Sequence, residues 1–125
     1  MKLIKILLID DEKDYCLLMK NFFLRNECEV QMAYSINEGL QMIEKFLPHI
    51  LFLDNNLPDG KGWNYVDEII EKRPEIQIHL VSAYRPAIEH IVAKDKIKVW
   101  EKPISLKDLS EILVSINAVP PTTDK

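Results

Sequence analysis

The fold of this chain is decided by residues 50–60, ILFLDNNLPDG. Four apolar residues run directly into the carboxylate of Asp54, and a polar turn with Pro58 and Gly60 follows at once. A continuous apolar run bounded by turn residues is typical of a strand buried on both faces, as in a parallel sheet. Asp54 is therefore predicted at the carboxyl end of a buried strand, held by rigid backbone and open to solvent on one side.

Strand and helix patterns alternate along the rest of the chain. Strands are predicted at residues 3–9, 29–34, 50–54, 76–81 and 97–100. Helices are predicted at residues 14–26, 36–46, 63–72, 86–93 and 106–117. This alternation predicts a parallel sheet with helices on both faces, and ligands bind such folds at the carboxyl ends of the strands.

Local signals support three of these helices in detail. Ser35 is a predicted N-cap with Glu38 completing a capping box, and Ser105 caps the last helix. In the first helix the spacing places one set of apolar side chains on a single face: Tyr15, Leu18, Met19, Phe22 and Phe23.

Composition limits the class of protein. The chain has 125 residues, of which 47% are apolar and 29% charged, so it can form one domain with a full core. A net charge of −4 with acids and bases intermixed predicts no direct nucleic-acid binding. No apolar run reaches the roughly 20 residues that span a membrane, and the first ten residues do not form a secretory signal. We expect a cytoplasmic domain at residues 1–118 and a disordered tail at 119–125.

Cysteine and histidine show no metal-binding pattern. Cys16 and Cys28 lack metal-ligand spacing and are interpreted as reduced thiols. The three histidines lie apart in the sequence and none neighbours a cysteine, so we interpret them as structural: His49, His79 and His90.

The predicted strands bring polar side chains to one edge of the sheet. The first strand ends in Asp10 and Asp11, the third in Asp54, the fourth in Ser82 and the fifth in Lys102. Three carboxylates in one crevice repel each other unless a cation neutralises them. Oxygen ligands without histidine or cysteine suit Mg²⁺, and a hydroxyl and an ammonium facing that cation suit a bound phosphoryl group.

This set of residues resembles the receiver domain of response regulators in bacterial two-component signalling, of the stand-alone, single-domain type. The resemblance covers residues 2 to about 117 and rests on Asp10-Asp11, Asp54, Ser82-Ala83, Lys102-Pro103 and the segment from Leu57 to Gly62. It implies a flavodoxin-like, doubly wound (βα)5 fold, with a five-stranded parallel sheet of order 2-1-3-4-5 and helices on both faces.

The resemblance also implies roles at the acidic end of the site. Asp54 is the nucleophile that takes a phosphoryl group and forms an acyl phosphate. Asp11 and Asp54 ligate Mg²⁺ directly, Asp10 acts mainly through water, and Asn56 offers its backbone carbonyl to the metal and lines the phosphoryl approach.

Further roles are implied around the phosphoryl group. Ser82 and Lys102 bind phosphoryl oxygens, and Ala83 is small enough to leave room for the group. The Lys102–Pro103 peptide is expected to be cis, because the free-energy cost of a cis bond is small before proline.

The chain departs from the family pattern where the signal is read out. Members usually carry Tyr or Phe three residues before the lysine, and Val99 stands there, with the aromatic Trp100 one residue later. Adjacent strand side chains point to opposite faces, so Trp100 cannot replace the usual aromatic without a register shift. Together with Tyr84 near the site, Val99 and Trp100 are the candidate readout residues.

The predicted function is a phosphoacceptor switch whose enzymatic activity is at most self-phosphorylation and slow autodephosphorylation. The alternative is a pseudo-receiver that acts as an interaction module without phosphorylation, which the displaced aromatic favours and the intact acidic set opposes. A Mg²⁺-dependent aspartyl phosphohydrolase is disfavoured because Asn56 stands where such enzymes typically have an acidic general acid.

The expected partners follow from the resemblance. A sensor histidine kinase or a histidine phosphotransfer protein donates the phosphoryl group, and an unidentified protein reads the result. The chain is expected to be a monomer or a phosphorylation-dependent dimer, without membrane contact.

Overall fold

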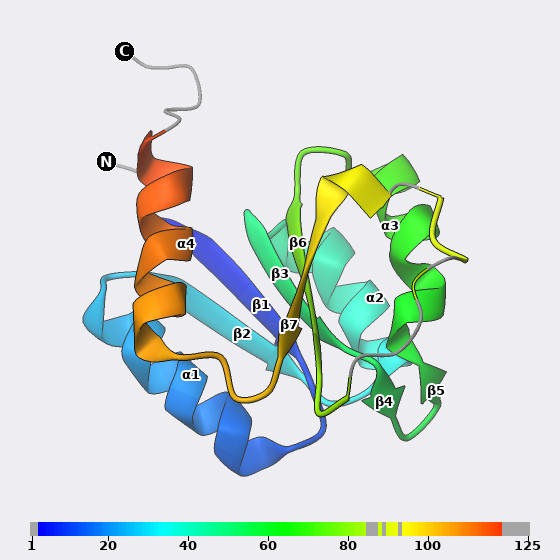
Figure 1. Ribbon diagram of the computed structural model, residues 1–125, viewed down its shortest axis with the longest axis horizontal. Coiled ribbons are helices and arrows are strands. Elements are labelled where there is room, and N and C mark those ends of the chain that lie inside the picture. The colour runs from blue at the N-terminus through cyan, green and yellow to red at the C-terminus, as the bar shows by residue number, and fades with distance from the viewer. Residues whose placement is uncertain (1–2, 85–87, 89, 93, 119–125) are drawn as a thin grey trace.

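Five parallel strands form one sheet of order β2-β1-β3-β6-β7 (Figure 1). Their bounds are Lys5–Ile9 for β1, Glu29–Ala33 for β2, Ile50–Asp54 for β3, Gln77–Ser82 for β6 and Ile97–Glu101 for β7. Counted along the chain, the order is 2-1-3-4-5, so the flavodoxin-like fold expected from the sequence is confirmed. The structure, a computed structural model, describes residues 3–84, 88, 90–92 and 94–118.

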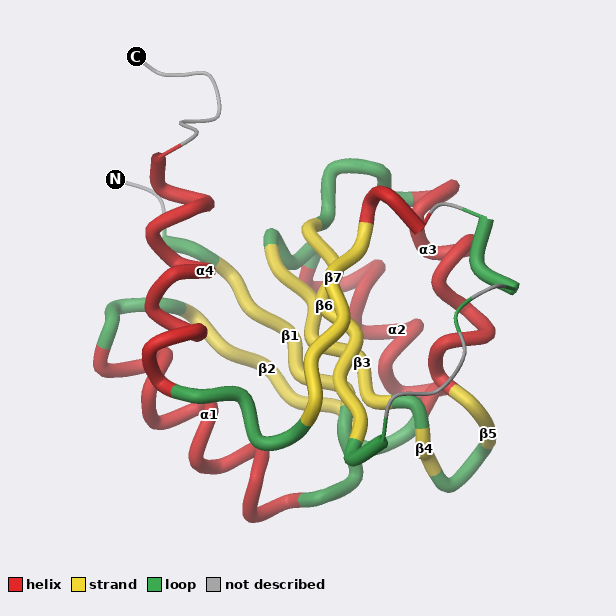
Figure 2. The backbone as a smooth tube through the Cα atoms, in the orientation of Figure 1, coloured by secondary structure: helices red, strands yellow, loops and turns green. Residues whose placement is uncertain are grey.

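Helices cover both faces of the sheet (Figure 2). They are α1 (Lys13–Arg25), α2 (Ile36–Phe46), α3 (Val66–Lys72) and α4 (Leu106–Ala118). Helices α2 and α3 pack on one face, where Ile43 and Ile69 join the core, and α1 and α4 pack on the other, where Phe23 and Leu109 do so. None of the helices in the described residues has the length and apolar character that crossing a bilayer requires.

The helix predicted at 86–93 falls partly outside the described residues. Its described members, Ile88 and residues 90–92, are not helical. Ile91 is buried, and its N–H donates to the Ile88 carbonyl at 2.9 Å. Within the described residues, a single turn brings Ile91 into the core.

The segment after β3 is more structured than predicted. A two-stranded hairpin, β4 (Asn56–Leu57) with β5 (Gly60–Lys61), precedes a 3₁₀ turn, η1 (Gly62–Tyr65). The helix predicted from Trp63 therefore starts at Val66. The backbone N–H of Trp63 donates to the Asn55 side chain at 3.1 Å, which ties this turn to the end of β3.

The N-terminus of α2 is capped from two directions. Ser35 Oγ accepts from the Glu38 N–H at 3.1 Å, as predicted, and Glu38 in turn accepts from the Tyr34 N–H at 2.8 Å. From the β4–β5 hairpin, Asp59 accepts from the N–H groups of Ile36 at 2.8 Å and Asn37 at 3.0 Å. The hairpin beside Asp54 is thereby fastened to α2.

The exposure of Leu18 differs from the sequence interpretation, whereas the state of the two cysteines agrees with it. Leu18, predicted on the inward face of α1, is exposed, because its position lies at the margin of the apolar stripe defined by Met19, Phe22 and Phe23. Cys16 and Cys28 are both free and buried, in agreement with the expectation of reduced thiols.

Candidate functional site

The carboxyl ends of the strands bring the predicted polar residues together. Asp10 directly follows β1, Asp54 ends β3, Ser82 ends β6, and Lys102 follows β7. Because β1, β3, β6 and β7 are successive neighbours in the sheet, these four side chains meet at one edge. The Lys102–Pro103 peptide after β7 is cis, as expected.

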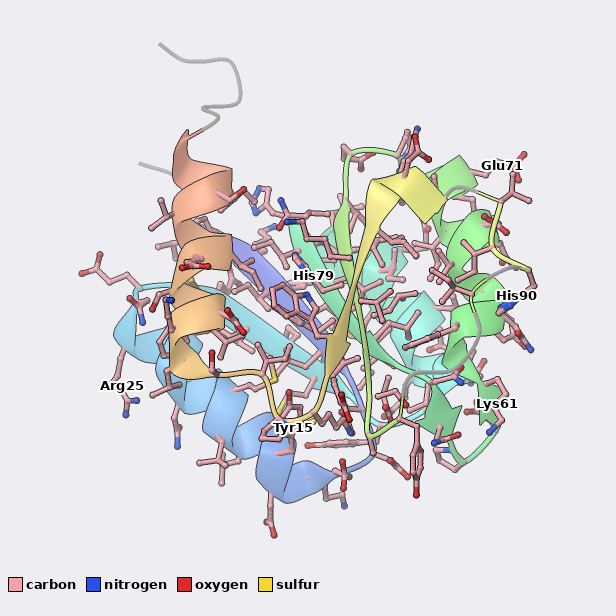
Figure 3. All side chains as sticks on the ribbon, viewed as in Figure 1. Tyr15, Arg25, Lys61, Glu71, His79 and His90 are labelled. Carbon is pink, nitrogen blue, oxygen red and sulfur yellow. The ribbon has the colours of Figure 1, made fainter. Side chains whose placement is uncertain are left out.

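Lys102 lies at the centre of a group of carboxylates. Its ammonium is 2.8 Å from Asp10 Oδ2 and 3.5 Å from Asp54 Oδ1, and it also pairs with Glu12. The ring of Tyr15, which is labelled in Figure 3, has its centroid 5.0 Å from the ammonium. Burial opposes the charge of Lys102, but hydrogen bonds to Asp10 and Glu12 outweigh it and raise the Lys102 pKa.

The three aspartates form a compact oxygen cluster. One carboxylate oxygen from each of Asp10, Asp11 and Asp54 lies within 4.8 Å of the other two. Asp10 and Asp54 are buried, whereas Asp11 faces solvent. Burial, followed by the charge of Asp10, raises the pKa of Asp54 to about 7. Burial likewise raises the pKa of Asp10.

This donor set fits a hard divalent cation. The cluster offers only oxygen atoms, one carboxylate is open to solvent, and burial raises the pKa values of Asp10 and Asp54. Mg²⁺ prefers oxygen ligands and retains several waters, so a half-open carboxylate cluster suits it.

The other predicted site residues have different exposures. Ser82 is fully buried, and its Oγ accepts from the Tyr84 N–H at 3.3 Å. Ala83 and Asn56 are exposed next to the site, and Asn56 Oδ1 accepts from the Lys61 ammonium at 2.6 Å. The Tyr84 ring is also exposed.

Val99 and Trp100 point to opposite faces of β7, as the strand alternation predicts. Val99 packs with the α2 and α3 side of the core, and Trp100 packs with the α1 and α4 side. The register pairs Val81 with Trp100 and Ser82 with Glu101, so no register shift brings Trp100 to the face of Val99.

Sequence reasoning missed the residues that hold the backbone around Asp54. The Trp63 indole N–H donates to the Leu53 carbonyl at 3.0 Å, and the Gly62 N–H donates to the Asn55 carbonyl at 2.8 Å. Because the Trp63 N–H also donates to the Asn55 side chain, hydrogen bonds fix both residues that flank Asp54. The signal available in the sequence was a tryptophan that follows Gly62 in an otherwise polar turn.

Sequence reasoning also gave Glu12 no role at this site. The carboxylate of Glu12 contacts the Lys102 ammonium, although its side chain is largely exposed. Its position directly after the acidic pair was the only available sign.

Comparisons with known proteins agree with this arrangement. The family model of the response regulator receiver domain matches residues 6–114. The photosynthetic apparatus regulatory protein RegA of Rhodobacter capsulatus is 26% identical over 120 residues, which cover 93% of this chain and 65% of RegA. The response regulator protein PilR of Pseudomonas aeruginosa is 24% identical over 114 residues, covering 89% of this chain and 25% of PilR.

The chain thus spans less than two thirds of the length of either relative. Among solved structures, a CheY-like receiver domain protein from Methanospirillum hungatei JF-1 superposes with a TM-score of 0.82. It is 24% identical, and the match covers 92% of this chain and 94% of that one. The match of the family model to most of the chain shows that the protein belongs to the response regulator receiver domain family of two-component signalling.

Proposed function

We propose that this receiver domain is a phosphoacceptor switch in which Asp54 receives a phosphoryl group from a phosphohistidine of a sensor kinase or phosphotransfer protein. One observation carries the proposal. The Asp54 carboxylate is buried at the end of a central strand, beside two further aspartates and within 3.5 Å of the Lys102 ammonium. A carboxylate so placed is a fixed nucleophile with positive charge close by.

The residues divide the work of phosphoryl transfer between them. An Asp54 oxygen attacks phosphorus, the P–N bond of the donor breaks, and its electron pair leaves with the imidazole. Asp10, Asp11 and Asp54 would hold Mg²⁺, with the backbone carbonyl of Asn56 as a further ligand. Bound there, Mg²⁺ supplies charge neutralisation for the transferred group.

Lys102 and Ser82 would bind the phosphoryl oxygens. The Lys102 ammonium already makes three contacts with carboxylates, so it must exchange at least one of them for a phosphoryl oxygen. The Ser82 hydroxyl accepts from the Tyr84 N–H and still has its O–H to donate to the new anion. Phosphorylation adds about −1.5 to −2 charge, which these two side chains would sense. The resulting change is read by a partner protein through surface contacts.

Intact mass measurement tests this function directly. The protein is incubated with acetyl phosphate and Mg²⁺, beside Asp54→Asn, which preserves the side-chain shape but removes the nucleophile. We expect one added phosphoryl mass that requires Mg²⁺ and is absent from Asp54→Asn.

A negative result is resolved with beryllofluoride, which mimics the acyl phosphate without turnover. If wild type gains no mass but its amide spectrum near Asp54 responds to beryllofluoride, hydrolysis outpaces the assay and the switch stands. If neither response occurs in folded protein, the switch is wrong and an interaction module that works without phosphorylation remains.

A further inference from the structure

A polar pair lies buried in the sheet face that α1 and α4 cover. The indole Nε1–H of Trp100 on β7 donates to Nδ1 of His79 on β6 at 2.8 Å. His79 is 2% exposed, and its Nε2 lies 2.7 Å from Gln77 Oε1. Because Nδ1 accepts, the ring proton sits on Nε2 and is donated to Gln77. Burial, with a smaller contribution from Lys98, lowers the His79 pKa to about 4, so the ring is neutral at pH 7.

The pair belongs to a row of rings that crosses three neighbouring strands. His79 stacks on Phe52 of β3 with centroids 5.0 Å apart and planes 20° apart, and Trp100 follows at 6.0 Å (His79 is labelled in Figure 3). Phe52 lines a small cavity that Asp10 and Asp54 also line. The row therefore reaches from beneath the acidic cluster to the edge of the sheet.

The edge strand carries Lys102 into the site. Strand β7 is bonded only to β6 within the sheet, and Trp100 pairs with Val81 in the ladder. Directly after β7, the Lys102 N–H donates to the Ser82 carbonyl at 2.8 Å. The reach of the Lys102 ammonium thus depends on how β7 lies against β6, and the indole–imidazole bond joins those two strands two residues before Lys102.

Packing alone does not require this pair. Two apolar side chains of similar volume would fill the same space without the cost of burying an imidazole and an indole N–H. In this structure each ring nitrogen of the pair has a hydrogen-bond partner, so none of their buried polar atoms is left unsatisfied.

We propose that Trp100, held by His79, is a positioning residue for Lys102: their hydrogen bond holds the edge strand so that the ammonium reaches the phosphoryl site. Trp100 also lines a groove of about 240 Å³ between β7 and α4, together with Ile112. A displacement of Lys102 is therefore passed to this groove through Trp100. This deepens, and rests on, the proposed phosphoacceptor function.

Four variants separate positioning from stability. His79→Leu removes the acceptor of the bond and Trp100→Phe removes its donor, and each variant fills the space with an apolar side chain. His79→Asn restores an acceptor, because Asn Oδ1 stands the same number of bonds from Cα as His Nδ1. Ile78→Val is the matched control: it trims a buried side chain on the same strand, facing the other side of the sheet.

The first readout is the rate of phosphoryl uptake from acetyl phosphate with Mg²⁺, followed by intact mass at a temperature where circular dichroism shows every variant folded. We expect His79→Leu and Trp100→Phe to be slower by on the order of tenfold, the cost of a misplaced catalytic group. His79→Asn should recover most of the rate, and Ile78→Val should match wild type. Equal rates in all variants, or losses that simply follow thermal stability with Ile78→Val included, overturn the proposal.

The second readout needs no phosphorylation. In metal-free protein, the ion-paired Lys102 ammonium gives a protected ¹⁵Nζ–H signal, which Lys102→Met assigns by its disappearance. We expect the signal to persist in wild type, Ile78→Val and His79→Asn, and to broaden in His79→Leu. If wild type neither takes up a phosphoryl group nor responds to beryllofluoride, the proposed function fails, yet this pattern still supports the positioning role. A signal that is the same in all four proteins overturns it.

Discussion

At the scale of single residues, the chemistry depends on how little charge compensation Asp54 has without a cation. Its carboxylate is buried with Asp10, and the nearby ammonium of Lys102 is shared among three carboxylates. The site is therefore electrostatically strained in the absence of metal. The same excess of negative charge would favour a bound Mg²⁺, which the proposed phosphoryl transfer requires.

The pH dependence of stability should reveal this strain. The pKa of Asp54 is about 7 when folded and roughly 3.9 when unfolded. Because the folded state binds the proton more tightly, the stabilisation is fully present below pH 4 and is lost as pH rises through 7. In urea denaturation with EDTA, wild type should lose free energy of unfolding between pH 4.5 and 8 that Asp54→Asn retains. At pH 8 the variant should be more stable by roughly 2 kcal/mol.

Identical pH profiles for wild type and Asp54→Asn would contradict this account. They would mean that Lys102 compensates the Asp54 charge fully. A control is Glu71→Gln, which changes an exposed glutamate on α3 away from the cluster and should not flatten the profile.

At the scale of elements, the turn after β3 is built around the Asp54 backbone. A Cβ on Gly62 would lie 2.3 Å from the Asp54 carbonyl oxygen, which cannot move without displacing the end of β3. Gly62→Ala should therefore lower the free energy of unfolding by about 3 kcal/mol and impair phosphoryl uptake as well. Thermal melting and the mass assay measure the two effects.

Gly39→Ala is the matched comparison. A Cβ there would meet Ile9 Cδ1 at 2.4 Å, but this atom is the end of a flexible side chain. Alanine also favours the α2 helix by up to about 1 kcal/mol over glycine. Gly39→Ala should cost clearly less than Gly62→Ala, and the reverse order would refute the backbone argument.

The two serine caps should also differ. Ser35 Oγ and Ser105 Oγ each accept one helix N–H, from Glu38 at 3.1 Å and Asp108 at 3.0 Å. Ser105→Ala should cost about 1 kcal/mol, the usual value for an N-cap. Ser35→Ala should cost less in the same denaturation assay, because Asp59 still holds the first turn of α2. A larger loss for Ser35→Ala would show that Asp59 adds nothing to the cap.

The success of prediction also differed from element to element. The five sheet strands, α2 and both caps were predictable because local pattern and final packing agree there. The β4–β5 hairpin was not predicted, because its antiparallel pairing spans only a few residues and leaves no period to detect. The start of α3 depends on Asn55 and Trp63, which contact each other only after the turn has folded.

The candidate site was predictable for a different reason. Its residues follow strand ends, and in a parallel sheet all strand ends of one kind lie at one edge. Sequence order therefore brought Asp10, Asp54, Ser82 and Lys102 together without knowledge of side-chain geometry. The contact of Glu12 with Lys102, and the bond between His79 and Trp100, depend on rotamers and strand register that no linear pattern specifies.

At the scale of the whole molecule, a ligand of the acidic cluster should stabilise the entire fold. The cluster joins the ends of β1 and β3 in the middle of the sheet, so a cation there binds only the folded state. Its effect follows mass action and reaches about 2.7 kcal/mol when the free ion is at 100 times its dissociation constant.

Mg²⁺ should accordingly raise the melting temperature of wild type in a concentration-dependent way, and EDTA should reverse the increase. Asp54→Asn removes one ligand charge and should show a markedly smaller increase. Ca²⁺ is larger and tests ion size, while NaCl at equal ionic strength controls for screening. An equal increase with NaCl would attribute the effect to ionic strength and not to a site.

The reactivity of the two buried thiols reports how often different parts of the structure open. Cys16 Sγ contacts the Asp10 carbonyl at 3.4 Å beneath the acidic cluster, whereas Cys28 lies between α1 and β2. A maleimide or disulfide reagent can react with either thiol only after that part of the structure opens, so the labelling rate gives the local opening free energy. Without any engineered cysteine, the ratio of the two rates would separate loosening at the site from opening of the opposite end of α1.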